Sequence, residues 1–156
     1  MVAVDGDDTY EAALDDLADR EDTGSHRFLQ EVLYSLETVS MGTHQLLYFS
    51  AMRYAGTYLD CAADDLDDAV DQLADRFHSM DVGTLTLEEE QLPARVALAD
   101  NVVVDAAPAT GRRMCYFIAG YIAGFLENCL DDGFVVNETG CMADGADACA
   151  FRVQQR

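Results

Sequence analysis

Apolar residues recur at helical spacing through most of the first half of the chain. This pattern predicts four helices, over residues 8–21, 26–38, 43–62 and 63–79. The first is acidic and amphipathic, the third is apolar around most of its circumference, and the fourth turns one apolar stripe inward. The first half of the chain is therefore predicted to be helical, with short connections between its helices.

The second half of the chain shows a different pattern, with short alternating or apolar runs. In chain order it predicts strands or extended segments at 83–87, 95–99 and 101–104, a helix at 111–130, and two hairpin strands at 134–139 and 148–153. This order predicts an α+β fold in which several helices pack on an antiparallel sheet, and the C-terminal helix is followed by a β-hairpin. We expect residues 1–24 to form an acidic N-terminal arm or helix and residues 25–156 to form the folded domain.

The charge of the chain is strongly one-sided. Thirty acidic residues face nine basic ones, which gives a formal net charge of -21. Self-repulsion of this kind destabilises a compact state in dilute buffer, whereas about 1 M salt shortens the screening length to roughly 3 Å. We therefore expect a halophilic protein in a salt-loaded cytoplasm, with recruitment of a basic partner as the alternative. The excess of acid leaves no basic patch for direct binding of nucleic acid.

The sequence contains neither an export signal nor a membrane segment that we recognise. Residues 1–24 are acidic, and the longest uncharged apolar run, 114–126, is shorter than the roughly 20 residues of a spanning helix. A cytoplasmic location is predicted. Because the chain has five Cys and no export signal, we expect metal ligands or buried thiols in place of structural disulfides. Cys61 and Cys129 are predicted to be buried thiols.

Three Cys and one Glu in the last third of the chain are predicted to converge. Strand alternation places Glu138 and Cys149 on the inward faces of the two hairpin strands, both at the loop end. Cys141 follows within the loop, and Cys115 lies on the inward stripe of the 111–130 helix. The four side chains are therefore expected to meet between the first turns of that helix and the open end of the hairpin.

These four side chains are a chemically coherent set of metal ligands. A carboxylate buried beside three thiols is costly unless a cation compensates it. Zinc suits thiolate and carboxylate donors best, and four protein ligands leave no open position for a reacting water, which indicates a structural site. Arg112 and Arg113 are placed to offset its negative charge. On spacing alone, separate buried Cys with an exposed Glu are the alternative.

The segment CYFIAGYIAGFLENCLDDGFVVNETGCMADGADACAFRV resembles the signature of the 4-vinyl-reductase (V4R) type of small-molecule-binding domain. The shared features are Gly120 and Gly124 in the helix, Glu138, Cys141, the Gly145-Ala-Asp147 loop and Cys149-Ala-Phe151. That family includes sensory domains of phenol- and toluene-responsive transcription activators, archaeal hydrocarbon-binding proteins and a protein tied to bacteriochlorophyll vinyl reduction, and its fold is similar to that of vesicle-tethering subunits. Its sensor members hold zinc, which implies as ligands here Cys115, Glu138, Cys141 and Cys149.

The aromatic residues concentrate on the two most apolar helices, 43–62 and 111–130, and most of them are expected in the core. A pocket for a small hydrophobic ligand is predicted between these helices, with the first candidates Tyr54, Tyr58, Tyr121 and Phe125. Gly120 and Gly124 each weaken a helix by about 1 kcal/mol, for which we expect close helix packing to compensate, with room for a ligand as the alternative. Phenol is not expected as the ligand because the chain has no Trp, and His44 is expected to be a cap-region or surface group.

We therefore expect a stand-alone, zinc-containing sensor or binding domain for a small, largely hydrophobic molecule. Such a domain would act through a regulatory partner protein and is expected to form a homodimer. The sequence contains no Ser-His-Asp set, no phosphate-binding Gly loop and no dinucleotide motif. Two alternatives are an enzyme or accessory protein acting on a vinyl-bearing tetrapyrrole, and a dimeric scaffold subunit.

Overall fold

The computed structural model describes residue 12 and residues 25–37, 42–104 and 109–156. Apart from residue 12, the acidic helix predicted over 8–21 lies outside the described residues. In chain order the elements are α2 (Ser25–Glu37), α3 (Gly42–Tyr58), α4 (Leu66–Ser79), β1 (Thr84–Glu89), β2 (Ala94–Ala99), α5 (Tyr116–Leu130), β3 (Phe134–Gly140), the short 3-10 helix η1 (Met142–Asp144) and β4 (Cys149–Gln155).

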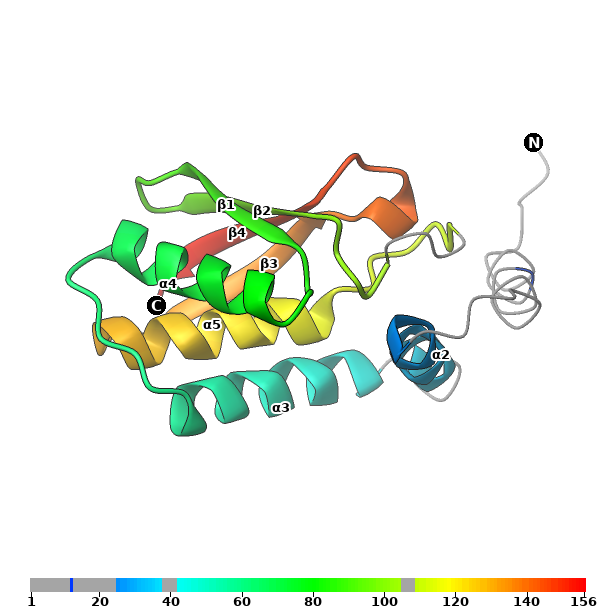
Figure 1. Cartoon of the computed structure of the whole chain (residues 1–156), viewed down its shortest axis with the longest axis horizontal. Helices are drawn as coiled ribbons and strands as arrows, with labels where there is room; N and C mark the ends of the chain where they lie inside the picture. The colour runs from blue at the N-terminus through cyan, green and yellow to red at the C-terminus, as the bar shows by residue number, and fades with distance from the viewer. Residues whose placement is uncertain (1–11, 13–24, 38–41, 105–108) are drawn as a thin grey trace.

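The four strands form one antiparallel sheet in the order β1-β2-β4-β3. β4 lies between β2 and β3, so the C-terminal hairpin is joined to the β1–β2 hairpin edge to edge. Helices α4 and α5 pack against the sheet, and α3 runs alongside α5 (Figure 1). The predicted α+β architecture, with helices on an antiparallel sheet and a hairpin after the last helix, is confirmed.

Alternation along the hairpin strands sets the position of the core. Phe134, Val136 and Glu138 of β3 are buried, as are Cys149 and Phe151 of β4, so both predicted inward faces are confirmed. The residues between Phe134, Val136 and Glu138 on β3 are half-buried or exposed. One face of the sheet therefore carries the core, as expected for an antiparallel sheet covered on one side.

The helix predicted over 43–62 ends earlier, at Tyr58, and the next helix begins at Leu66 instead of residue 63. Asp65 caps α4, because its side chain accepts a 3.0 Å hydrogen bond from the backbone N–H of Asp68. Residues 59–65 thus form a connection between the two helices. The sequence pattern did not predict it, because apolar residues continue at helical spacing beyond Tyr58.

The segment before the last helix also differs from expectation. Residues 101–104, predicted to be extended, form a buried turn in which the N–H of Val104 donates to the carbonyl of Asn101 at 2.9 Å. The predicted helix over 111–130 begins only at Tyr116. Before it, Gly111 has a φ of 67° and its N–H donates to the carbonyl of Ala143 at 3.0 Å, which ties this loop to the hairpin loop.

The two glycines of α5 allow it to approach α3 closely. A Cβ placed on Gly120 would lie 2.0 Å from the carbonyl oxygen of Tyr48, and one on Gly124 would lie 2.0 Å from that of Met52. Both distances are far below any van der Waals contact. The packing explanation of these glycines is therefore confirmed, and they leave no room for a ligand at these two points.

The opposite side of α3 turns apolar side chains to the surface. Leu46 is 67% exposed, Phe49 61% and Tyr58 70%, and Tyr54 is also exposed. The expectation that the aromatic residues of this helix lie in the core is wrong for three of them. The contact with α5 buries only one side of α3. Because α3 has more apolar residues than that side can hold, some of them lie on the surface.

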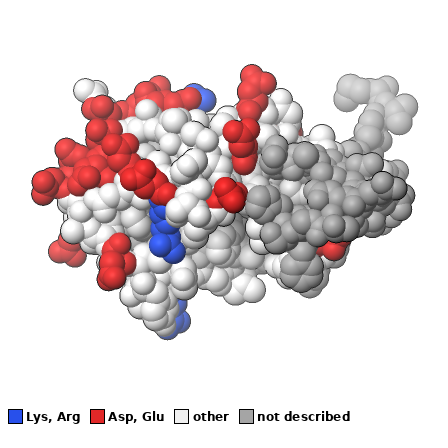
Figure 2. Space-filling model, viewed as in Figure 1, with Lys and Arg blue, Asp and Glu red and all other residues white. Residues whose placement is uncertain are grey.

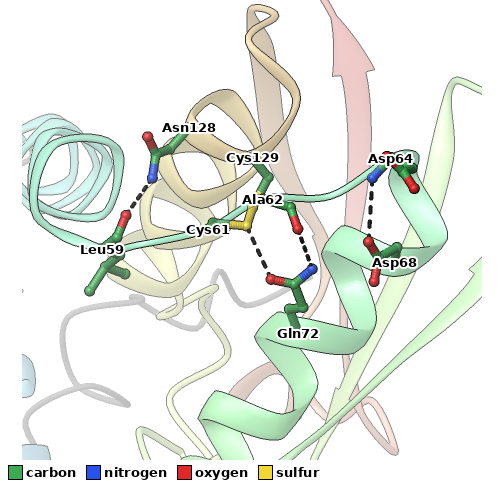
Figure 3. Close-up of a disulfide and its surroundings, with 8 residues drawn as sticks. All are labelled: Leu59, Cys61, Ala62, Asp64, Asp68, Gln72, Asn128 and Cys129. Atoms are coloured by element: carbon green, nitrogen blue, oxygen red, sulfur yellow. Dashed lines mark hydrogen bonds between the residues drawn. A yellow bond between two sulfur atoms is a disulfide. The ribbon is translucent and has the colours of Figure 1, made fainter.

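The prediction of buried free thiols at Cys61 and Cys129 is wrong, because the two form a disulfide. The bond joins the α3–α4 connection to the last turn of α5, and Gln72 of α4 holds the same connection by donating to the carbonyl of Ala62 at 2.8 Å (Figure 3). Sequence spacing could not reveal the pair, because 68 residues separate the two positions.

The acidic side chains gather over the end of the molecule that carries α4 (Figure 2). Five Asp residues of α4 and its N-terminal approach are exposed: Asp64, Asp65, Asp67, Asp68 and Asp71. Among the described residues, no helix combines the length and apolar character that a membrane crossing requires.

Candidate metal centre and cavity

The structure brings the four predicted metal ligands together. The ligand atoms of Cys115, Glu138, Cys141 and Cys149 all lie within 4.8 Å of one another. The Sγ atom of Cys115 is 3.5 Å from that of Cys149 and 3.8 Å from that of Cys141. The three cysteines are 0% exposed and the glutamate 7% exposed, so the cluster is part of the core.

Each residue of the cluster lies at or near the end of a different element. Cys115 is the N-cap of α5 with φ -97° and ψ 34°, which corrects the expectation that it lies on the inward stripe of the helix. Cys141 is the N-cap of η1, immediately after a register shift in β3 between Glu138 and Gly140. Cys149 begins β4 and pairs in register with Leu98. The irregular strand end lets the loop thiol turn back over the hairpin.

Glu138 is oriented by backbone contacts. Its Oε2 accepts a 3.1 Å hydrogen bond from the backbone N–H of Cys115, and its own carbonyl accepts one of 2.9 Å from the guanidinium of Arg113. Arg113 is predicted to offset the charge of the cluster, and the structure places its guanidinium on the peptide carbonyl of Glu138. The backbone of Arg112 contacts the side chain of Thr110, whose hydroxyl donates to the Arg112 carbonyl at 3.3 Å and accepts from the Arg112 N–H at 3.2 Å.

Burial and hydrogen bonds within the cluster shift the pKa values of its members in different directions. Burial, together with the adjacent Cys141, raises the pKa of the Glu138 carboxyl to about 8. Hydrogen bonds with the other two cysteines raise the pKa of Cys115 well above its usual value. Hydrogen bonds from Cys115 and Cys141 lower the pKa of Cys149 to about 3. At neutral pH this arrangement holds a thiolate at Cys149 and protons at Glu138 and Cys115.

The cluster fits a divalent cation. Three sulfurs and one carboxylate oxygen are the donor set of a tetrahedral zinc site. The second oxygen of the glutamate, Glu138 Oε1, is buried and has no hydrogen-bond partner among the described residues. A buried oxygen in that state is costly, and a cation bound to the carboxylate removes the cost. The described residues therefore include a buried Cys/Glu cluster that could bind a metal ion.

A cavity of about 460 Å³ opens between α3, the start of α5 and the outer edge of β3. Its lining is mostly apolar and largely aromatic, with a few polar groups at its border. The lining residues are His44, Gln45, Tyr48, Phe49, Met52, Tyr116, Phe134, Val135, Asn137 and Arg156. The hydroxyl oxygen of Tyr48 accepts a 3.2 Å hydrogen bond from the backbone N–H of Val136, which fixes α3 against the strand.

None of the four residues predicted to contact a ligand lines this cavity. Tyr54 and Tyr58 are exposed on α3, whereas Tyr121 and Phe125 of α5 are buried. The hydroxyl of Tyr121 accepts a 2.6 Å hydrogen bond from Arg76 of α4. The structure brings three of these rings together, since the ring centroid of Tyr54 lies 5.7 Å from that of Tyr58 and 6.4 Å from that of Tyr121. Ligand contact by the four residues stays a prediction.

Sequence reasoning missed the residues that form the cavity. His44 lies in the first turn of α3, as expected, but it is half-buried and its ring stacks on that of Tyr116 with centroids 3.9 Å apart. The alternation of β3 shows that Val135 and Asn137 face away from the core. It does not show that α3 stands beside that edge, so no sequence signal marked the cavity.

Comparison with protein families identifies the C-terminal part of the chain. Residues 94–155 match the family model of the V4R domain, and this segment includes all four residues of the cluster. An uncharacterised protein of Methanocaldococcus jannaschii is 26% identical over 83 residues, which are 53% of this chain and 51% of that protein. A second one is 54% identical over 41 residues, 26% of this chain and 23% of that protein. The chain therefore spans about half, or less, of the curated relatives it matches.

Solved structures of other proteins share this fold. A vinyl-4-reductase family protein from Methanocaldococcus jannaschii has a TM-score of 0.59 at 21% identity, covering 96% of this chain and 94% of its own. The phenol-responsive sensory domain of the transcription activator PoxR, solved with phenol, gives 0.54 at 13% identity and covers 99% and 92%. A trafficking protein particle complex subunit 3 from Naegleria fowleri, covalently bound to palmitic acid, gives 0.50 at 18% identity and covers 97% and 92%.

Proposed function

We propose that this chain, which carries a V4R domain over residues 94–155, is a zinc-containing binding module for a small, largely hydrophobic molecule. The observation that carries the proposal is that one strand serves both sites. β3 contributes Phe134, Val135 and Asn137 to the cavity and Glu138 to the Cys/Glu cluster. We therefore expect a change at either site to affect the other through this single short strand.

The cavity supports a small ligand that is mostly apolar. Its volume of about 460 Å³ lies within the range of about 300 to 1,000 Å³ typical of small-molecule sites. Rings of Tyr48, Phe49 and Tyr116 supply apolar contact area, and His44 and Asn137 supply polar groups for one or two hydrogen bonds. Two proteins of the same fold were solved with phenol and with palmitic acid, which agrees with this class of ligand.

Zinc is proposed as a structural ion that fastens the C-terminal hairpin. Four protein donors complete its tetrahedral coordination and leave no position for a reacting water. Cys115 is one of those donors, and the next residue in the chain, Tyr116, borders the cavity. Zinc therefore fixes the backbone that places the Tyr116 ring, and we expect ligand binding to depend on the metal without direct contact between ligand and metal.

Titration of zinc-loaded protein with phenol, naphthalene and palmitate, followed by calorimetry, tests the proposal. The variant Gln45→Trp places an indole in the cavity from an exposed position of α3, and Ser50→Trp places one at an exposed position of the same helix that does not line it. We expect Gln45→Trp to abolish binding of the best probe and Ser50→Trp to preserve it. Failure of all three probes to bind the zinc-loaded wild type would refute the binding function.

A second role is favoured by the outward face of α3, defined by Leu46, Tyr54 and Tyr58. These side chains are exposed, and large apolar side chains gathered on one exposed helix face are typical of an interaction site in a soluble domain. We infer that this face forms a homodimer interface. Light scattering after size exclusion should show a dimer for the wild type and for Gln91→Glu, an exposed position between β1 and β2, and a monomer for Leu46→Glu combined with Tyr58→Glu. A dimer that binds none of the probes would favour the scaffold alternative.

Two further predictions concern the environment of the protein. The exposed Asp residues of α4 support a halophilic character, which follows from the net charge of -21. The Cys61–Cys129 disulfide argues against the predicted cytoplasmic location, because structural disulfides are rare in reducing compartments. Action through a regulatory partner protein is proposed together with the binding function, as the route by which ligand occupancy is read.

A further inference from the structure

Asn101 contacts the cysteine cluster without being one of the predicted ligands. Its side chain is 0% exposed, and its Nδ2 donates to Cys115 Sγ at 3.2 Å and to Cys149 Sγ at 3.4 Å. Its Oδ1 accepts a 3.1 Å hydrogen bond from the backbone N–H of Val103. Because that N–H can only donate, it fixes the orientation of the amide and directs the NH₂ group toward the two sulfurs.

The turn that carries Asn101 is anchored independently of the cluster. The N–H of Val102 donates to the carbonyl of Val82 at 2.8 Å, and the buried side chain of Gln30 donates to the carbonyl of Val102 at 2.9 Å. These contacts connect the turn to α2 and to the segment before β1. The turn therefore holds the amide of Asn101 in place through contacts that do not involve the cluster.

We propose that Asn101 is the positioning residue of the metal centre, holding Cys115 and Cys149 at the spacing that one cation requires and withdrawing negative charge from their sulfurs. Three thiolates and a carboxylate around a divalent ion leave a formal charge of -2 inside the core. N–H donors directed at the sulfurs spread that charge, which strengthens retention of the metal. The inference rests on the proposed zinc site.

Two substitutions separate this role from simple support of the turn. Asn101→Asp keeps an oxygen that accepts from the N–H of Val103 but replaces the NH₂ donor with a second oxygen. Asn101→Leu removes both functions at similar volume. If Asn101 only supports the turn, Asn101→Asp should bind metal normally and Asn101→Leu should bind it less well. If Asn101 acts as a donor to the sulfurs, metal binding should be impaired in both variants. Asn128→Asp is the matched control, because that amide donates to the carbonyl of Leu59, away from the cluster.

The experiment measures zinc affinity by competition with a chromophoric chelator, and the sulfur-to-metal charge-transfer band after loading with Co²⁺. We expect both Asn101 variants to bind zinc about 10- to 100-fold more weakly than the wild type, as loss of an outer partner of a metal ligand does. The charge-transfer band should move to lower energy, because sulfurs without N–H donors are easier to oxidise. Asn128→Asp should match the wild type in both. Wild-type affinity and band position in Asn101→Asp would overturn the inference.

A measurement on the wild type covers the case in which the variants do not fold. In ¹⁵N-labelled protein loaded with ¹¹³Cd²⁺, the side-chain amide protons of Asn101 should show scalar coupling to the metal, transmitted through the hydrogen bonds to the sulfurs. Cadmium bound without any such coupling would overturn the role of Asn101 and leave the metal centre intact. A wild type that binds neither zinc, cobalt nor cadmium would instead refute the proposed metal centre itself, and the role of Asn101 with it.

Discussion

The Cα atoms of Cys61 and Cys129 lie 4.9 Å apart although 68 residues separate them in the chain. Their disulfide joins the connection between α3 and α4 to the C-terminal turn of α5, and the amide of Asn128 beside it donates to the carbonyl of Leu59 (Figure 3). Three helices thus meet at one covalently fastened corner, at the end of α5 opposite to Cys115 of the Cys/Glu cluster. A disulfide thus holds the C-terminal end of α5, whereas the thiols of the Cys/Glu cluster lie at its N-terminal end.

Removal of this disulfide should lower the free energy of unfolding by about 2 to 4 kcal/mol, because the unfolded chain regains the freedom of a long closed loop. Denaturant unfolding of the Cys61→Ala and Cys129→Ala double variant, with zinc kept in excess, measures the loss. Dithiothreitol should destabilise the wild type by a similar amount and leave the double variant unchanged. A double variant that remains sensitive to the reductant would assign the effect to the metal-site cysteines.

Stabilisation by zinc should depend on the cluster cysteines and not on the disulfide. Added zinc is expected to raise the melting temperature of the wild type and of Cys61→Ala, because binding to the folded state alone shifts the folding equilibrium. In Cys141→Ala and Cys149→Ala the increase should disappear. Differential scanning calorimetry with and without zinc gives the comparison, and an undiminished increase in either cluster variant would contradict the assigned ligands.

Zinc binding should release protons at pH 7 and should tighten as the pH rises toward about 8. The Glu138 carboxyl, with its pKa raised to about 8, and the Cys115 thiol, with its pKa also raised, hold protons that the cation must displace. Above about pH 8 the carboxyl is already ionised and its contribution to the slope ends. Calorimetric titrations in two buffers of different ionisation enthalpy count the protons.

The matched variant for this measurement is Glu138→Gln, which keeps the shape of the side chain and carries no titratable proton. It should release fewer protons than the wild type at the same pH and bind zinc more weakly. Equal proton release from the two proteins would show that the carboxyl is already ionised in the metal-free state, contrary to its raised pKa.

The close approach of α3 and α5 makes Gly124 intolerant of a side chain. A Cβ at this position would lie 2.0 Å from the carbonyl oxygen of Met52, so Gly124→Ala should cost about 1 to 3 kcal/mol of stability through overpacking. Gly140→Ala is the control, because a Cβ there would meet its nearest neighbour at 3.7 Å. Urea unfolding of the two variants tests the packing, and equal stabilities would contradict it.

Folding should require high salt. At a formal net charge of -21, repulsion between surface carboxylates returns as salt falls below about 1 M and the screening length grows. The melting temperature is expected to rise steeply between about 0.1 M and 2 M KCl. A melting temperature in dilute buffer that equals the value at high salt would rule out the halophilic interpretation.

The convergence of the cluster residues could be predicted because strand alternation and a short hairpin restrict their positions closely. Glu138, Cys141 and Cys149 lie within twelve residues, so the inward faces of two paired strands already place their side chains together. Cys115 was assigned correctly to the cluster but on the wrong local structure, since it caps α5 and does not belong to its stripe. The error changed nothing at the site because the cap and the first turn occupy nearly the same place.

The sequence by itself determined the α+β class, the inward faces of the final hairpin and the donor set of the cluster, since periodicity and short-range spacing encode these directly. Tertiary structure decided the Cys61–Cys129 pairing, the cavity beside β3 and the contact of Asn101 with two sulfurs. Each of these joins segments that are distant in the chain. Their meeting depends on how α3, α5 and the sheet pack as whole bodies, and no local pattern of residues carries that information.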